Sequence, residues 1–164
     1  MDLTAFKLED LLLAGIKSEA EAREVYLAAA ARVRNFLLRD RLQFLAAEEE
    51  KHERLLRVIF QGKFPRADAT PPSSSPVPLP ALHVTDDTTP LTALLTQAMA
   101  AEQAAHDFYS SLSARMRDDK DAARMLAYMA RMELGHYKLL ADERDAAGAA
   151  EDIDGVWPMT HVGP

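Results

Sequence analysis

The pattern Glu-x-x-His occurs twice in this chain, as Glu49 and His52 in "EEEKHERLL" and as Glu133 and His136 in "MELGHYKLL". On a helix, a spacing of three residues puts both side chains on one face. Carboxylate and imidazole groups together suit iron or manganese as ligands. One such pattern is weak evidence, because many chains of this size contain one by chance. Two copies, each followed by a pair of leucines, favour a metal site.

Four segments rich in Ala, Leu, Glu and Arg can position these residues, and they predict helices over 5–34, 37–61, 91–117 and 120–145. The segment 62–90 contains seven prolines, so it cannot form a helix and is predicted to be an extended crossover. Gly148 is expected to stop the last helix, so that 1–147 form one bundle and 148–164 an irregular C-terminal tail. Four amphipathic helices, two short turns and one long crossover between the second and third helices predict an all-α four-helix bundle.

The inward face of each predicted helix is apolar except near its middle. Steps of three and four residues along each helix place there Glu19, then Glu49 with His52, then Glu102, and then Glu133 with His136. The two halves of the chain repeat this arrangement, at a separation of 83 residues between Glu19 and Glu102 and of 84 between His52 and His136. This internal repeat makes an accidental placement of the acids less credible.

Four carboxylates inside an apolar core need compensating charge, because burying an unpaired carboxylate is very costly. No lysine or arginine lies on the four inward stripes, and two divalent cations would balance the four negative charges. In the run Glu48, Glu49 and Glu50, only Glu49 shares a face with His52, because successive helix residues are rotated by about 100°. Glu48 and Glu50 are therefore expected to lie in water.

Two tyrosines recur at the same place in each half, because Tyr26 follows Glu19 and Tyr109 follows Glu102 by seven residues. They are interpreted either as core aromatics or as hydrogen-bond donors to a ligand carboxylate. His106 lies one turn beyond Glu102, either as a flanking residue or as an auxiliary ligand.

Composition limits the remaining function classes. The chain has 164 residues, a formal net charge of −7 and no cysteine. The acidic balance argues against a nucleic-acid surface, and no apolar run is long enough to span a membrane. The first residues lack the pattern of a signal peptide, so a cytoplasmic protein is expected. Without cysteine there is no disulfide, no thiolate nucleophile and no thiolate metal ligand.

At these residues the chain resembles the rubrerythrin family of the ferritin-like superfamily. The resemblance covers residues 5–145 and depends on "KSEAEAREVY", "AAEEEKHERLL", "AAEQAAHDFY" and "RMELGHYKLL". It implies a ferritin-like bundle with two iron ions, or manganese or zinc in their place. By this resemblance Glu19 and Glu102 are terminal ligands, Glu49 and Glu133 bridge the two ions, and His52 and His136 bind one ion each.

The resemblance also implies a function. Rubrerythrins reduce hydrogen peroxide at such a site, and some relatives oxidise or store iron. We therefore expect an oxidoreductase that acts on hydrogen peroxide or dioxygen, works with an external electron donor and forms a homodimer. The alternative is a non-catalytic iron-binding protein or a ferroxidase-type iron-handling protein. Two departures stand out: no cysteine is present for a rubredoxin-like domain, and Ala105 occupies the place of a further ligand carboxylate.

Overall fold

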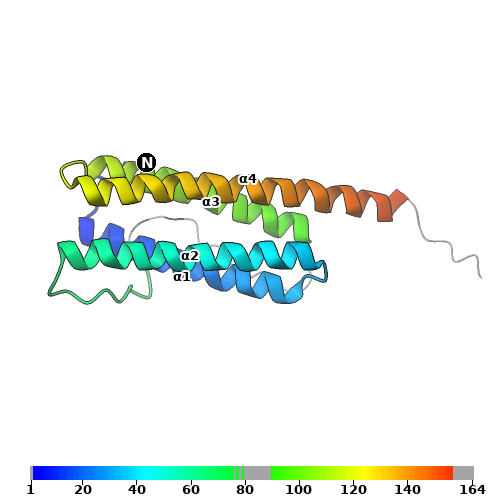
Figure 1. Ribbon diagram of the computed structural model, residues 1–164, viewed down its shortest axis with the longest axis horizontal. Coiled ribbons are helices and arrows are strands. Elements are labelled where there is room, and N and C mark those ends of the chain that lie inside the picture. Colours follow the sequence, from blue (N-terminus) through cyan, green and yellow to red (C-terminus); the bar gives the residue numbers. More distant parts are fainter. Residues whose placement is uncertain (1, 76, 78, 80–89, 157–164) are drawn as a thin grey trace, which may run out of the picture.

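The computed structural model describes residues 2–75, 77, 79 and 90–156, with side chains up to residue 149. Its four helices are α1 (Leu8–Arg32), α2 (Phe36–Lys63), α3 (Leu91–Arg115) and α4 (Lys120–Val156). They lie side by side along one axis, and no strand occurs among the described residues (Figure 1). The predicted all-α, ferritin-like four-helix bundle is confirmed. None of these helices combines the length and the apolarity that a membrane-spanning segment needs.

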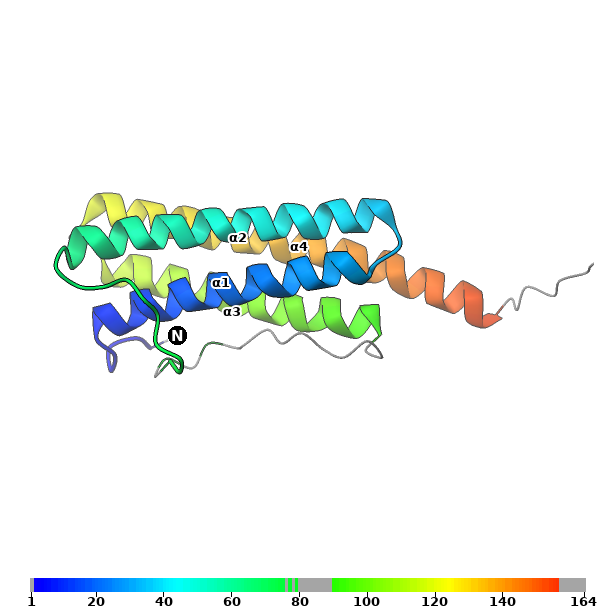
Figure 2. The same cartoon turned by 90° about the horizontal axis from the view of Figure 1, so that it is seen from below.

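The chain forms two antiparallel helical hairpins, α1 with α2 and α3 with α4. The hairpins contact each other where α2 packs against α4 and through side chains of α1 and α3. Helix α3 begins at the end of the bundle opposite to the start of α1 (Figure 2). The segment between α2 and α3 must therefore cross the whole length of the bundle. In this arrangement residues near the middle of all four helices can share one level.

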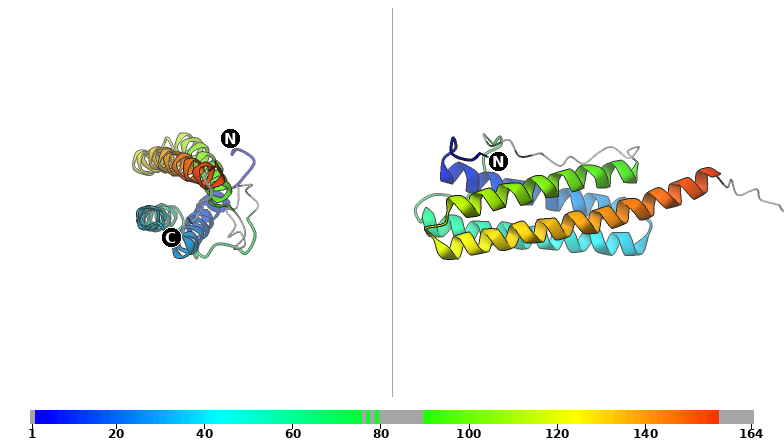
Figure 3. Two further views of the ribbon diagram at one scale, coloured as in Figure 1. Left: turned by 90° about the vertical axis from the view of Figure 1, so that its right-hand side faces the viewer. Right: turned by 90° about the horizontal axis from the view of Figure 1, so that it is seen from above.

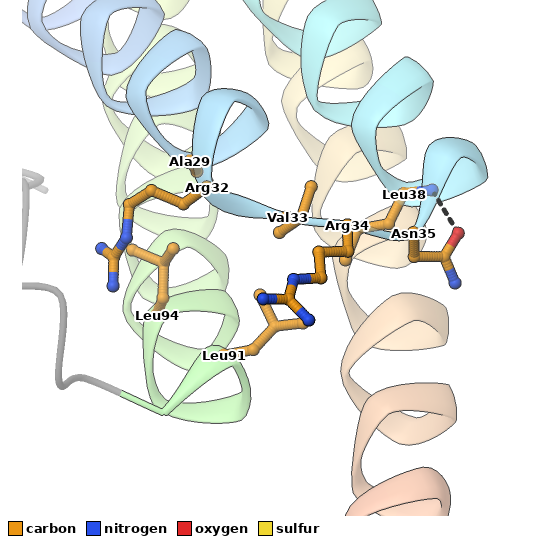
Figure 4. A pocket seen from close by; sticks show the side chains of 8 residues that line it. All are labelled: Ala29, Arg32, Val33, Arg34, Asn35, Leu38, Leu91 and Leu94. Atoms are coloured by element: carbon orange, nitrogen blue, oxygen red, sulfur yellow. Dashed lines mark hydrogen bonds between the residues drawn. The ribbon is translucent and has the colours of Figure 1, made fainter.

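Short capped turns fix the two hairpins. The side chain of Asn35 accepts hydrogen bonds from the backbone nitrogens of Leu37 and Leu38, and Figure 4 shows the second of these. It thus caps the start of α2. At the other turn, the Asp119 carboxylate accepts from the Ala122 nitrogen and pairs with Lys63 at 2.5 Å. This ion pair links the end of α2 to the start of α4.

The described part of the crossover packs on the bundle. Val77 is buried in the core, and Leu79 packs against the same cluster. The guanidinium of Arg57 on α2 donates to the Ala69 carbonyl over 2.8 Å. These contacts attach a proline-rich segment, which cannot form a helix of its own, to the side of the bundle.

Helix α4 is longer than the sequence pattern predicts. It continues through Gly148 to Val156 and projects beyond the other helices (Figure 3). The predicted stop at Gly148 is therefore wrong, and the remaining tail residues 157–164 lie outside the described residues. Gly148 is flanked by alanines, the best helix formers, and glycine within a helix costs only about 1 kcal/mol relative to alanine. A glycine that ends a helix usually adopts a positive φ, and no described glycine does.

The apolar core consists of two clusters, one toward each end of the bundle. One contains Leu12, Leu56, Phe108 and Leu126 among its members, and the other contains Leu42, Leu95 and Leu140. The level between them holds the Glu and His residues of the four inward stripes. The core is therefore interrupted where the sequence predicts a metal site.

Candidate metal centre

All six predicted ligands are buried at one level of the bundle: Glu19, Glu49, His52, Glu102, Glu133 and His136. Ligand atoms of the two Glu-x-x-His pairs all lie within 4.8 Å of one another. The outer carboxylates flank this group, because Glu19 Oε2 lies 3.7 Å from His52 Nδ1 and Glu102 Oε2 lies 3.7 Å from His136 Nδ1. The structure thus brings together every residue that the sequence pattern placed at the site.

The two central glutamates contact both imidazoles. Glu49 lies 3.1 Å from His52 Nδ1 through Oε2 and 3.3 Å from His136 Nδ1 through Oε1. Glu133 lies 3.1 Å from His136 Nδ1 and 2.9 Å from His52 Nδ1. The two imidazole rings stack with centroids 5.5 Å apart. Each central carboxylate therefore lies between two imidazoles, a position from which it can bridge two ions.

Some polar atoms of this cluster are left without hydrogen bonds in the protein. Glu49 Oε1 and Glu133 Oε1 are buried and accept none. A buried polar atom without a partner is costly, and such atoms are uncommon in native cores. Carboxylate oxygens and imidazole nitrogens facing one another, without a thiolate, are donors that suit iron or manganese. The residues present therefore fit a pair of divalent cations.

The two tyrosines reach across the bundle to the outer glutamates. Tyr26 on α1 donates a hydrogen bond to Glu102 on α3, and Tyr109 on α3 donates one to Glu19 on α1. Gly15 leaves room for this, because a Cβ atom there would lie 3.4 Å from the Tyr109 hydroxyl and 3.1 Å from Leu56 Cδ1. Of the two interpretations of these tyrosines, the structure supports the hydrogen bond to a site carboxylate.

We expect Tyr109→Phe and Tyr26→Phe each to lower the free energy of unfolding by about 1.5–3 kcal/mol, the usual range for a hydrogen bond to a charged group. The ring still fills the core in each variant, but the carboxylate loses a buried donor. Urea unfolding of the metal-loaded protein, in which the outer carboxylates are ionised, measures the change. Tyr128→Phe, at an exposed phenol, is the matched control and should leave the free energy unchanged. Equal effects at positions 109 and 128 would contradict the structural role of the buried hydroxyl.

Protons balance the charge of this cluster when no metal is bound. Burial, together with the charges of Glu133 and Glu49, raises the pKa of Glu19 well above 4.5, and burial with the charge of Glu49 raises the pKa of Glu102 in the same way. Burial also opposes ionisation of Glu49, but the adjacent imidazoles of His136 and His52, 3.3 and 3.1 Å away, hold its pKa down at about 2.

The imidazoles take up the opposite charge. Burial disfavours the imidazolium form, but hydrogen bonds to the surrounding glutamates raise the pKa of His136 to about 12 and raise that of His52 strongly as well. Two imidazolium groups then face the ionised Glu49 and Glu133, while the two outer carboxyls are neutral. A metal pair would have to displace these protons.

One residue near the site was placed incorrectly from the sequence. Glu48 was expected in water, but it is only 7% exposed and pairs with Lys51. It lies four residues before His52, so the two side chains are neighbours on the helix surface. That spacing was a signal for its proximity to the site. Glu50, at the other side of Glu49, is partly exposed and 3.8 Å from Arg54.

Among the described residues, one further histidine lies outside the cluster. His106 is partly buried, and its Nδ1 lies 2.6 Å from the Ala130 carbonyl oxygen, which fits the flanking interpretation. His83 and His161 lie outside the described residues. A cavity of about 460 Å³ opens at the α1–α2 turn, between Arg32, Arg34 and Leu91 (Figure 4). Ala29 in its wall is ten residues, or about 15 Å along α1, from Glu19, so this cavity is separate from the metal centre.

Comparisons with known proteins agree with this geometry. A family model described as Rubrerythrin matches residues 10–144. A solved structure of a hypothetical protein from Pyrococcus furiosus is similar, with a TM-score of 0.77 and 32% sequence identity over 89% of this chain and 93% of that chain. No curated protein matches this chain. The matched residues begin in the first turn of α1, end within α4 and include every residue of the Glu/His cluster.

Proposed function

The chain belongs to the rubrerythrin family, and from this premise we propose that its Glu/His cluster holds two iron ions and that the protein is an oxidoreductase acting on hydrogen peroxide or dioxygen. The observation that carries the proposal is the convergence of two Glu-x-x-His pairs and two further glutamates at one buried level. Manganese or zinc would suit the same donor atoms.

The protein's own residues would have distinct tasks. Glu49 and Glu133 lie between the two imidazoles and would bridge the ions, whereas Glu19 and Glu102 would each bind one ion from the outside. The hydroxyls of Tyr26 and Tyr109 hold the outer carboxylates in place. The apolar clusters on both sides of the level exclude bulk water from it. When bound, the iron pair supplies redox chemistry by changing between the +2 and +3 states.

The electron donor must come from elsewhere, because the chain has no cysteine that could hold a rubredoxin-type iron. A homodimer is part of the proposal, and light scattering of the purified protein tests it against the monomer mass of 18.1 kDa. Ala105 is partly buried and packs against the core, so the further carboxylate of related sites is missing here. The reactivity of this chain toward peroxide therefore has to be measured directly.

We expect reduced, iron-loaded protein to be reoxidised rapidly by hydrogen peroxide and to turn over repeatedly when a reductant is supplied. Stopped-flow absorption under anaerobic conditions measures the first step, and peroxide consumption measures the second. Reoxidation once, without repeated turnover, would favour the alternative of an iron-binding or ferroxidase-type iron-handling protein. A chain that binds no iron would contradict both functions.

A further inference from the structure

A cavity of about 350 Å³ opens next to the metal centre, between α2 and α4. Its walls include Glu48, Lys51 and His52 from α2 and Tyr128 from α4. Tyr128 is 47% exposed and Val58, also in the wall, is 62% exposed, so the mouth of the cavity faces the surface. His52 is the one residue that belongs both to this wall and to the Glu/His cluster.

His52 presents a free nitrogen on the side away from the cluster. Its Nδ1 faces Glu133 at 2.9 Å and Glu49 at 3.1 Å, so the Nε2 edge of the ring points away from them. This Nε2 is buried and has no hydrogen-bond partner in the protein. His136 Nε2 is unpartnered too, but only His52 lines this cavity. An unpartnered imidazole nitrogen next to a cavity is suited to a ligand that occupies the cavity.

Glu48 adds a carboxylate to the same wall. It precedes His52 by four residues, a spacing that makes the two side chains neighbours on α2. Its charge is now balanced by Lys51, whose side chain is 57% exposed and can leave without disturbing the core. A carboxylate and an imidazole nitrogen side by side are ligands for a divalent cation.

The equivalent positions in the second half of the chain carry no such pair. At the repeat offset of 84 residues, the counterparts of Glu48 and Lys51 are Met132 and Gly135. Neither counterpart carries a carboxylate or an ammonium group, and a Cβ atom added at Gly135 would meet nothing within 4 Å. The polar wall beside His52 is thus a local departure from the symmetry of the bundle.

We propose that Glu48 and the Nε2 edge of His52 form a transit site for divalent cations, through which the metal centre is loaded from the α2–α4 side. The ion displaces Lys51 from Glu48, binds between Glu48 and His52, and moves inward when the imidazole turns about its Cβ–Cγ bond. The ion keeps its charge and oxidation state throughout. This inference rests on the proposed metal centre and adds the route by which that centre fills.

The test compares loading rates and final metal content in the full-length, metal-free chain. Cobalt(II) is the probe, and its visible absorption is followed by stopped flow. We expect Glu48→Gln to take up cobalt about tenfold more slowly than the wild type. Tenfold is the low end of the acceleration that electrostatic steering gives to an association rate. Its final content should still be two ions per chain. Lys51→Met should load faster than the wild type, because the competing cation is gone.

Glu50→Gln is the matched control, because it removes the same charge from the same helix outside the cavity wall. It should load at the wild-type rate. The transit site would be overturned if Glu48→Gln loaded at the wild-type rate, or if Glu48→Gln and Glu50→Gln were slowed equally. It would also be overturned if Glu48→Gln lost one ion, because Glu48 would then be a resident ligand. If the wild-type chain takes up no cobalt, the proposed metal centre itself is wrong. If Glu48→Gln binds two ions at an unchanged rate, only the proposed loading route is wrong.

Discussion

The Glu49→Ala variant should bind at most one metal ion per chain, whereas the wild type should bind two. Glu49 lies 3.1 Å from one imidazole and 3.3 Å from the other, so its loss removes a donor shared by both halves of the centre. Changing a residue that merely supports a metal ligand already costs about 10–100-fold in affinity, so the loss of a bridging ligand should cost at least that. Metal analysis of purified protein, followed by titration of the metal-free chain, measures the effect.

Neighbouring acids on the same helices are the controls. Glu50→Ala should keep both ions and change the free energy of unfolding by less than about 0.5 kcal/mol, as is usual away from special sites. On α4, Glu133→Ala should behave like Glu49→Ala, and Asp121→Ala should behave like the wild type. If Glu50→Ala lost the metals and Glu49→Ala kept them, the assignment of the bridging glutamate would be wrong.

Removal of the metals should lower the melting temperature by on the order of 10 °C. Ions present at a thousandfold excess over their dissociation constant stabilise a protein by about 4 kcal/mol. For a chain of this length, each kcal/mol shifts the melting temperature by about 2–4 °C. Calorimetry of the loaded and the chelator-treated protein in the same buffer measures the difference.

The two forms should also respond to pH in opposite directions. In the metal-free fold, the pKa values of Glu19 and Glu102 are raised above 4.5, and that of His136 is raised from 6.5 to about 12. A group with a raised pKa stabilises the fold below its ordinary pKa, and this contribution is lost as the pH rises through the raised value. The metal-free protein should therefore be more stable at pH 6 than at pH 9. The lowered pKa of Glu49, about 2, works in the opposite direction only in more acidic solution.

The loaded form should lose metal affinity over the same acidification, because its ligands must give up protons to bind the ions. Loading in a weakly buffered solution should therefore release protons, which a pH indicator or titration calorimetry in buffers of different ionisation enthalpy detects. Equal melting temperatures with and without metal, or loading without proton release, would count against a charged cluster at the middle of the bundle.

Most of the site could be predicted from the sequence because helical periodicity is regular over long segments. Steps of three and four residues identify the inward stripe, and a polar residue such as Glu102 on an otherwise apolar stripe is conspicuous. Glu48 was misplaced because periodicity places it beside the inward stripe, whereas in the fold it borders the same cavity as Tyr128 of α4 and is buried. Periodicity within one helix does not reveal what a neighbouring helix covers.

The helix ends were harder to predict for a related reason. Asn35 stops one helix or starts the next according to its backbone angles, and its φ of −64° with ψ of 116° suits a cap before a helix. Gly148 could end α4 only by adopting a left-handed conformation, and the surrounding alanines favour continuation. Both outcomes depend on small differences in local free energy that composition alone does not resolve.

The crossed tyrosines have a consequence for how such a protein can diverge. Each helical hairpin carries three of the six Glu/His residues and one tyrosine that serves a glutamate of the other hairpin, so two identical hairpins could build the whole centre as a symmetric pair. In such a pair every substitution would appear on both sides at once. Joining the hairpins in one chain removes that constraint. Position 48 can then be a glutamate while its counterpart is Met132, and the two faces of one metal centre can acquire separate tasks.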